Sequence, residues 1–179
     1  MRVKDMTLIG VTAALLCIAG PFTVAIGPVP LSLATFAVYL AGAVLGWKRG
    51  TAAVIVYLLI GMAGVPVFSG FTGGFQKLAG VTGGYLAGYV ICALITGLGS
   101  GAPRQVHPIW ILTACMVAGT AALYLLGTVW FMAQTGKALG AALALCVIPF
   151  LPGDAVKIAA AVMISRPVRK AVYPVRAQS

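Results

Sequence analysis

The sequence IPFLPGDAVK (residues 148–157) places two prolines and a glycine inside an otherwise apolar segment. Proline lacks the backbone N–H that a helix interior requires, so Pro149 and Pro152 predict a break in the helix. Pro152 also suits the first turn of a second helix, where no bond is lost. Asp154 and Lys157 are three residues apart, which sets both on one face of that second helix. We therefore expect a broken helix with an ionic pair close to the break.

The composition of the whole chain excludes a protein that folds in water. Of its 179 residues, 61% are hydrophobic and 8% are charged, and the mean hydropathy is +1.09. Soluble domains carry about 25% charged residues, so this chain has too few to cover a surface in water. We expect an all-α integral membrane protein. The twelve Lys and Arg against two acids then indicate cytoplasmic loops rather than a nucleic-acid partner.

Six apolar segments have the length of membrane-spanning helices, which need roughly 20 residues. They cover residues 7–26, 31–47, 51–67, 83–99, 108–132 and 138–164. The remaining residues supply loops and tails, so we expect a single transmembrane domain over residues 1–179. Nine of the twelve basic residues fall on the side of the two termini, and two, Lys77 and Lys137, fall on the other side. The positive-inside rule then predicts that both termini are cytoplasmic.

The depth of the ionic pair in the membrane follows from helix geometry. Asp154 precedes the boundary residue Arg166 by twelve positions, which is about 18 Å of helix. This distance places Asp154 slightly outside the midplane of the bilayer and Lys157 close to it. Ionisable residues at such depth usually face a polar cavity, and a lysine at the start of a half-helix suits an anionic or polar solute. The alternative is an ion pair that only joins two helices.

Two loops are expected on the same outer face as the broken helix. The glycine-rich loop 68–85 carries aromatic side chains, including Tyr85, and Gln76 and Lys77 offer hydrogen bonds. The short loop GPVPLS (27–32) contains two prolines and is either a tight turn or the hinge of a lid. Together with the helix break, these loops predict a pocket that opens to the outside.

The residues that carry chemistry are too few for an enzyme. The four cysteines fall within the spans and lack metal-ligand spacing, and His107 stands alone, so we expect no metal site. Asp154 has no second acid, histidine or nucleophile beside it for acid–base catalysis within the membrane. No phosphate-binding glycine loop is present, so we expect no cofactor and no ATP hydrolysis in this chain. A pore-forming channel would need a ring of selectivity groups, which the sequence lacks.

Five short motifs occur in order along the chain: PVPLSL (28–33), GWKRG (46–50), GVPVF (64–68), TGGYL (82–86) and PGDAVK (152–157). In these motifs the sequence resembles the BioY family, the biotin-specific substrate-binding (S) components of energy-coupling factor (ECF) transporters. The resemblance extends from residue 6 to residue 166, almost the whole chain. Ala34 and Val81 stand where the family often has glutamine and proline.

The resemblance implies a six-helix protein of the bacterial cytoplasmic membrane that captures biotin from outside. By matching position, Asp154 and Lys157 would belong to the biotin pocket. Further candidates for binding are Gln76, Lys77 and Tyr85. The alternatives are an S component for another small anionic vitamin and a biotin transporter that works alone.

The resemblance also implies protein partners, namely a transmembrane coupling protein and two cytoplasmic ATPase subunits that hydrolyse ATP. Small residues spaced four apart allow helices to pack closely in lipid. The first span has such a spacing and resembles the family's contact for the coupling protein. The candidate interface residues are Gly10, Ala13, Ala14 and Cys17.

Overall fold

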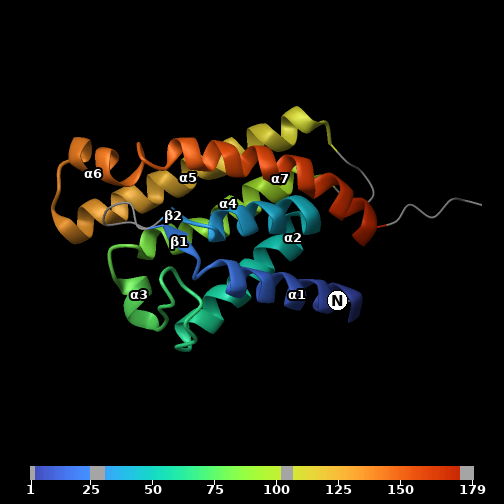
Figure 1. Ribbon diagram of the computed structural model, residues 1–179, viewed down its shortest axis with the longest axis horizontal. Helices are drawn as coiled ribbons and strands as arrows, with labels where there is room; N and C mark the ends of the chain where they lie inside the picture. Colours follow the sequence, from blue (N-terminus) through green and yellow to red (C-terminus); the bar gives the residue numbers. More distant parts are fainter. Residues whose placement is uncertain (1–2, 25–30, 102–106, 174–179) are drawn as a thin grey trace, which may run out of the picture.

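The computed structural model describes residues 3–24, 31–101 and 107–173. Most of these residues are in helices, which loops and one short pair of strands connect. The elements are α1 (Val3–Ala19), β1 (Thr23–Val24), β2 (Leu31–Ser32), α2 (Ala34–Met62), α3 (Phe75–Ala79), α4 (Gly83–Gly99), α5 (Ile109–Thr135), α6 (Leu139–Cys146) and α7 (Leu151–Val172). The long helices follow the long axis of the molecule, with the start of α1 and the end of α7 at one end (Figure 1). The short elements α3, α6, β1 and β2 lie towards the other end, where β1 and β2 form an antiparallel pair.

The chain reverses direction in the middle of α2, at Gly46. This residue has φ +79° and ψ 175°, a conformation that glycine adopts readily and that interrupts the helix. A Cβ added to Gly50 would lie 2.6 Å from the carbonyl oxygen of Ala41. In an unbroken helix, residues nine apart would be separated by about 13.5 Å along the axis. The two arms of α2 therefore fold back on each other, and they correspond to the predicted segments 31–47 and 51–67.

Two of the predicted segments extend too far at their C-terminal ends. The first was expected to reach residue 26, but α1 ends at Ala19 because Pro21 cannot continue the helix. The third was expected to reach residue 67, but α2 ends at Met62. Gly64 follows with φ +102°, outside the helical range, and Pro66 comes next.

The last predicted segment breaks where its prolines indicate. α6 ends at Cys146 and α7 begins at Leu151, and the two helices are bent by 49° relative to each other. Pro152 lies in the first turn of α7, as expected. The prediction of a broken last helix is confirmed, although α7 continues to Val172, eight residues beyond the predicted end.

Length and composition support fewer membrane spans than the sequence predicts. α5 is long and apolar enough to cross a bilayer, α2 has a similar length and composition but folds back on itself at Gly46, and α6 with α7 adds one more candidate if the bent pair is one span. α4 is apolar but has 17 residues. The count of six spans and the orientation of the termini thus remain predictions.

Small residues allow α4 to pack closely against its neighbours α2 and α5. A Cβ on Gly84 would come within 2.7 Å of the Leu126 carbonyl oxygen in α5. A Cβ on Gly97 would collide with backbone atoms of Trp47 in α2. Such close approach increases van der Waals contact between helices, which lipid does not drive together by itself.

Basic side chains connect the helices at the end of the molecule where α1 begins and α7 ends. The buried guanidinium of Arg169 donates to the carbonyl oxygens of Ala43 at 3.1 Å, Ser100 at 2.5 Å and Gly101 at 3.0 Å. These contacts join α7 to the first arm of α2 and to the C-terminal end of α4. Burial lowers the pKa of the Arg169 guanidinium from its ordinary value.

Arg49, in the turn of α2, ties the same end to α1 and to the end of α7. It forms an ion pair with Asp5 at 3.0 Å and donates to the Tyr173 hydroxyl at 2.8 Å. Lys4 donates to the Val172 carbonyl oxygen at 3.1 Å. Three further basic residues that the sequence assigns to this side lie outside the described residues: Arg2, Arg104 and Arg176.

We predict that Gly97→Ala destabilises the fold, because the added methyl group forces α4 away from the backbone of Trp47. Overpacking of this kind costs about 1–3 kcal/mol, which lowers the midpoint of thermal unfolding in detergent. Gly10→Ala is the matched control, since a Cβ at Gly10 meets no atom within 4 Å. Equal midpoints for the two variants would contradict the close approach of α4 and α2.

Candidate functional site

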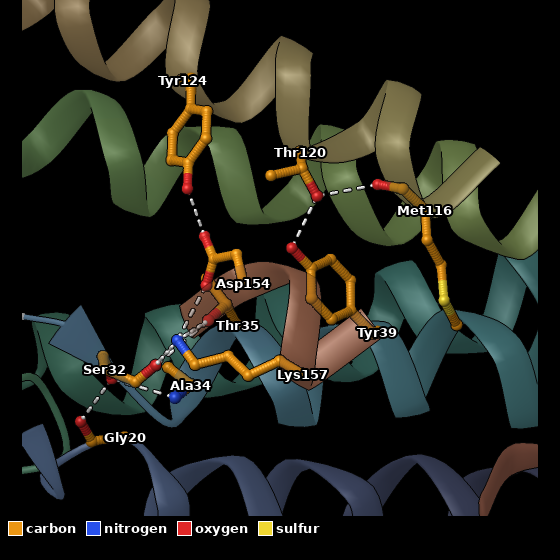
Figure 2. A network of polar contacts seen from close by, with 10 residues as sticks. All are labelled: Gly20, Ser32, Ala34, Thr35, Tyr39, Met116, Thr120, Tyr124, Asp154 and Lys157. Carbon is orange, nitrogen blue, oxygen red and sulfur yellow. Dashed lines mark hydrogen bonds and ion pairs between the residues drawn. The ribbon is translucent and has the colours of Figure 1, made fainter. Parts of the chain in front are cut away.

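Asp154 and Lys157 form a buried ion pair in the first two turns of α7. The Lys157 Nζ lies 2.9 Å from Asp154 Oδ1, and the two side chains are 11% and 6% exposed, respectively. The same Nζ donates to the Ser32 carbonyl oxygen at 2.7 Å and to Thr35 Oγ1 at 2.9 Å. An ammonium group has three hydrogens, so these three partners use all of them. Figure 2 shows that the partners come from α7, from β2 and from the start of α2.

Tyr124 of α5 completes the coordination of the carboxylate. Its hydroxyl donates to Asp154 Oδ2 at 2.5 Å, so both carboxylate oxygens accept a hydrogen bond (Figure 2). One turn earlier on α5, Thr120 shares a hydrogen bond of 2.6 Å with the Tyr39 hydroxyl and donates to the Met116 carbonyl oxygen. A buried charge is stable only when its partners replace the lost water, and here they do so on both oxygens.

The position of Ser32 explains why a backbone carbonyl faces the lysine. The Ser32 Oγ accepts the Ala34 N–H at 2.9 Å and donates to the Gly20 carbonyl oxygen at 3.1 Å. It thereby satisfies one of the free N–H groups at the start of α2. With its side chain held on both sides, Ser32 presents its carbonyl oxygen to Lys157, and Thr35 follows on the first turn of α2.

The ion pair forms the polar floor of a cavity of about 530 Å³, a volume that includes its opening to solvent. Ser69, Lys77 and Thr82 add polar groups from the glycine-rich loop and its end. Aromatic side chains form much of the wall, namely Phe68, Tyr85, Tyr89, Tyr124 and Phe150. The cavity therefore combines a charged but paired floor with flat apolar walls.

The glycine-rich loop is fixed to the bundle at both of its ends. Phe68 is fully buried and packs edge-on against the Tyr57 ring at 5.7 Å, and the Tyr57 hydroxyl donates to the Val67 carbonyl oxygen. At the other end, the Trp130 indole donates to the Gly80 carbonyl oxygen at 2.9 Å. These anchors hold α3 next to the cavity.

Four of the five residues that the sequence proposes for binding line the cavity: Tyr85, Lys77, Asp154 and Lys157. The fifth, Gln76, is exposed and is absent from the cavity lining among the described residues. Adjacent residues of a helix point in different directions, so α3 cannot turn both Gln76 and Lys77 to the cavity. Residues 27–30 of the proline-containing loop lie outside the described residues.

Tyr124 and Thr35 also belong to the site, and the sequence motifs did not indicate them. Tyr124 lies in the apolar segment 108–132 without any polar motif around it, and its only signal is a hydroxyl within a span. Thr35 follows the PVPLSL motif closely, so proximity to that motif could have identified it.

The proposed interface residues of α1 do not share one surface. Gly10 and Ala14 are exposed, Cys17 is half-buried, and Ala13 is 1% exposed within the core. Ala13 therefore contacts the rest of the bundle rather than the outer face. Among the described residues, no group of three or more His, Cys, Asp or Glu could hold a metal ion.

Comparisons with known proteins agree on one family. The sequence profile of the BioY family matches residues 1–174. The chain is 40% identical, over 92% of its length and 96% of the relative's, to a protein of Pyrococcus horikoshii described as a probable biotin transporter BioY. It is 36% identical, over 93% of its length and 96% of the relative's, to the biotin transporter BioY of Thermotoga maritima. A crystal structure of the S-component for biotin from an ECF-type ABC transporter matches with a TM-score of 0.82 and 25% identity, over 96% of this chain and 95% of that one.

We predict that Asp154→Asn and Lys157→Met each destabilise the protein by about 3 kcal/mol, because each leaves the other charge buried and unpaired. The double variant should lose clearly less than the sum of the two, since it buries no unpaired charge. Thermal unfolding in detergent measures the three losses. Lys137→Met, which removes an exposed lysine, is the control and should leave the midpoint unchanged. Additive losses would contradict the coupling of the pair.

Proposed function

The chain belongs to the BioY family, whose members are transporter components and not enzymes. We propose that it captures biotin as the substrate-binding subunit of a vitamin importer. The observation that carries the proposal is the cavity with its paired floor and aromatic walls. Biotin presents a ureido group, an apolar fused ring system and a carboxylate. Each of these has a matching surface in the cavity.

The floor of the cavity suits the ureido group better than the carboxylate. Lys157 uses all three of its hydrogens within the chain, so it has none left for an anion. The carboxylate of Asp154 accepts one bond on each oxygen and keeps further lone pairs. These lone pairs can accept the ureido N–H groups, which would place the apolar rings between the aromatic walls.

The carboxylate of biotin would then lie at the mouth of the cavity, beside Lys77. Lys77 is half-buried at the edge of the lining, and no hydrogen bond or ion pair within the described residues engages its ammonium group. A charge-assisted hydrogen bond to a carboxylate is roughly twice as strong as a neutral one. Lys77 therefore has both the position and the free donors for the anionic end of the ligand.

We propose six membrane spans with both termini on the cytoplasmic side and the cavity towards the outside. The described basic residues Lys4, Arg49, Arg166 and Arg169 gather at the end opposite the cavity. The positive-inside rule assigns such an end to the cytoplasm. The reversal at Gly46, next to Lys48 and Arg49, supports a cytoplasmic turn between two spans.

For uptake, we propose that the chain works with a transmembrane coupling protein and two ATPase subunits in a cytoplasmic membrane. The similar crystal structure is described as part of an ECF-type ABC transporter. On α1, Gly10 and Ala14 leave a shallow, small-residue surface on the outside of the bundle. Such a surface allows a partner helix to approach closely.

We predict that the purified chain binds biotin tightly in detergent and that it discriminates biotin from biotinamide through Lys77. Loss of one charge-assisted bond should weaken binding roughly tenfold, so biotinamide should bind about tenfold more weakly than biotin. In Lys77→Ala, biotin should fall to the level of biotinamide. Isothermal titration measures all four affinities, and Lys137→Ala, which removes an exposed lysine that does not line the cavity, is the control.

A panel of other vitamins completes this experiment. Tighter binding of a different anionic vitamin would reject biotin as the substrate while leaving the fold unaffected. Unchanged discrimination in Lys77→Ala would reject the proposed position of the carboxylate and leave biotin as the ligand.

We predict that Gly10→Leu weakens assembly with the coupling protein and ATPases without changing biotin binding. The leucine side chain would occupy the surface that the partner helix needs, whereas the cavity lies elsewhere in the bundle. Co-purification of the complex and biotin uptake in cells measure the effect. Gly140→Leu on α6 is the matched control, since a Cβ there also meets no atom within 4 Å. Equal losses in both variants would exclude a specific role for α1.

A further inference from the structure

A second hollow, which shares Tyr124 and Asp154 with the lining of the substrate cavity, lies between α5 and α7. Its volume is about 1,160 Å³, including the part that is open to the surroundings. Most side chains along its length are apolar or small, among them Val117 and Ala121 of α5 and Ala159, Val162 and Met163 of α7, and its polar members are two threonines, Tyr124 and Asp154. The two helices run side by side along one face of the bundle (Figure 1).

The length of this groove corresponds to one leaflet of a bilayer. Along α7 it extends from Leu151 to Met163, and twelve residues of helix measure about 18 Å. The hydrocarbon core of a bilayer is about 30 Å thick, so one leaflet contributes roughly 15 Å. A single acyl chain that starts at one surface of the membrane would fill the groove.

The end of the groove carries a cation with unused hydrogen-bonding capacity. Arg166 lies one turn beyond Met163 on the same face of α7. Its guanidinium makes a single hydrogen bond among the described residues, 3.4 Å to the His107 carbonyl oxygen just before α5. Its Nε is buried and has no partner within the described part of the chain. A guanidinium presents five N–H donors that match a phosphate in a forked geometry.

An aromatic side chain marks the membrane surface at the same end. Trp110 is 68% exposed and lies on α5, one turn before Thr113. Thr113 is part of the groove lining. Tryptophan favours the boundary between hydrocarbon and headgroups. Arg166 and Trp110 thus stand at headgroup level, and the apolar groove begins directly beyond them.

We propose that one anionic phospholipid binds between α5 and α7, with its phosphate on Arg166 and one acyl chain in the groove. The acyl chain of the lipid would reach Tyr124 and Asp154, which line both this groove and the substrate cavity. The lipid excludes water from the rear of the hydrogen bond between these two side chains. This proposal concerns lipid binding in the absence of substrate and does not depend on the identity of the vitamin.

Native mass spectrometry of the purified full-length chain, without biotin, tests the proposal. Micelles carry equal amounts of phosphatidylglycerol and phosphatidylcholine with the same acyl chains. We expect one retained lipid per chain with a preference for phosphatidylglycerol. Arg166→Gln should lower this preference by about fivefold, the effect of one basic residue near anionic lipid. Lys48→Gln removes a charge elsewhere at the same end and should leave the preference unchanged.

The groove is tested with a matched pair of apolar substitutions on α7. Ala159→Leu fills the groove and should reduce retention of both lipids. Val156→Leu enlarges a side chain that is 70% exposed and outside the groove, and it should leave retention unchanged. Quenching of Trp110 fluorescence by phosphatidylglycerol with brominated acyl chains, in a variant carrying Trp47→Phe and Trp130→Phe, checks the place of binding.

Two results would overturn the proposal. The first is retention of lipid that neither Arg166→Gln nor Ala159→Leu changes, which indicates a non-specific lipid shell. The second is a dimer whose copies cross-link between α5 and α7, which indicates that a second copy of the chain fills the groove.

Discussion

The buried contact between Asp154 and Lys157 fixes the relative positions of helices that are far apart in the sequence. A single charge at the centre of a bilayer costs about 2.5–3.5 kcal/mol on insertion scales, so each of the two must find partners. Tyr124 supplies one partner from α5, while Ser32 and Thr35 supply others from β2 and the start of α2. The polar groups of the site are therefore also the groups that bring α2, α5 and α7 together. A substitution made to alter binding acts on packing as well.

This arrangement leaves the floor of the cavity without net charge. Because the ammonium and the carboxylate neutralise each other, an anionic ligand gains little from a direct contact with Lys157. In the proposed binding mode, recognition depends on lone pairs at Asp154, on aromatic surfaces and on a second cation, Lys77, near the opening. A pocket of this kind favours a molecule that is polar and neutral at one end, apolar in the middle and anionic at the other end.

The features of the fold that local sequence determines could be predicted, and those that depend on how helices rotate against each other could not. Pro149 and Pro152 mark the break between α6 and α7, because proline lacks an N–H and suits the first turn of a helix, whereas Pro167 lies inside α7 without ending it. The spacing of Asp154 and Lys157 likewise fixes their common face. Tyr124 is thirty residues away from Asp154, and its role follows only from the rotation of α5. Gln76 was assigned to the site from its loop, but the short helix α3 turns its side chain outwards.

For the basic residues too, the sequence predicts their position along the chain but not their burial, which depends on how the helices pack. Their distribution predicts an end of the molecule rich in positive charge, since each is close to a predicted boundary. From the sequence, Arg169 is one of the basic residues that predict the cytoplasmic side. In the structure its guanidinium is buried and donates to three carbonyl oxygens. Burial depends on α4 and α2 meeting beside α7, and Gly97 permits the close approach of α4 to α2. No local pattern distinguishes Arg169 from Lys170, which is exposed.

The position of Arg169 has a mechanical consequence for how a ligand enters. Separation of α4 from α7 at that end would strip a guanidinium of its carbonyl partners, so that end behaves as the fixed base of the bundle. The cap at the cavity end is held by fewer groups: a hydrogen bond from an indole to Gly80, an edge-on ring contact at Phe68 and a two-residue strand pair. The least costly deformation is therefore a bending of this cap away from a stationary base. We expect breathing motion to be larger at the cavity end than at the end that Arg169 ties together.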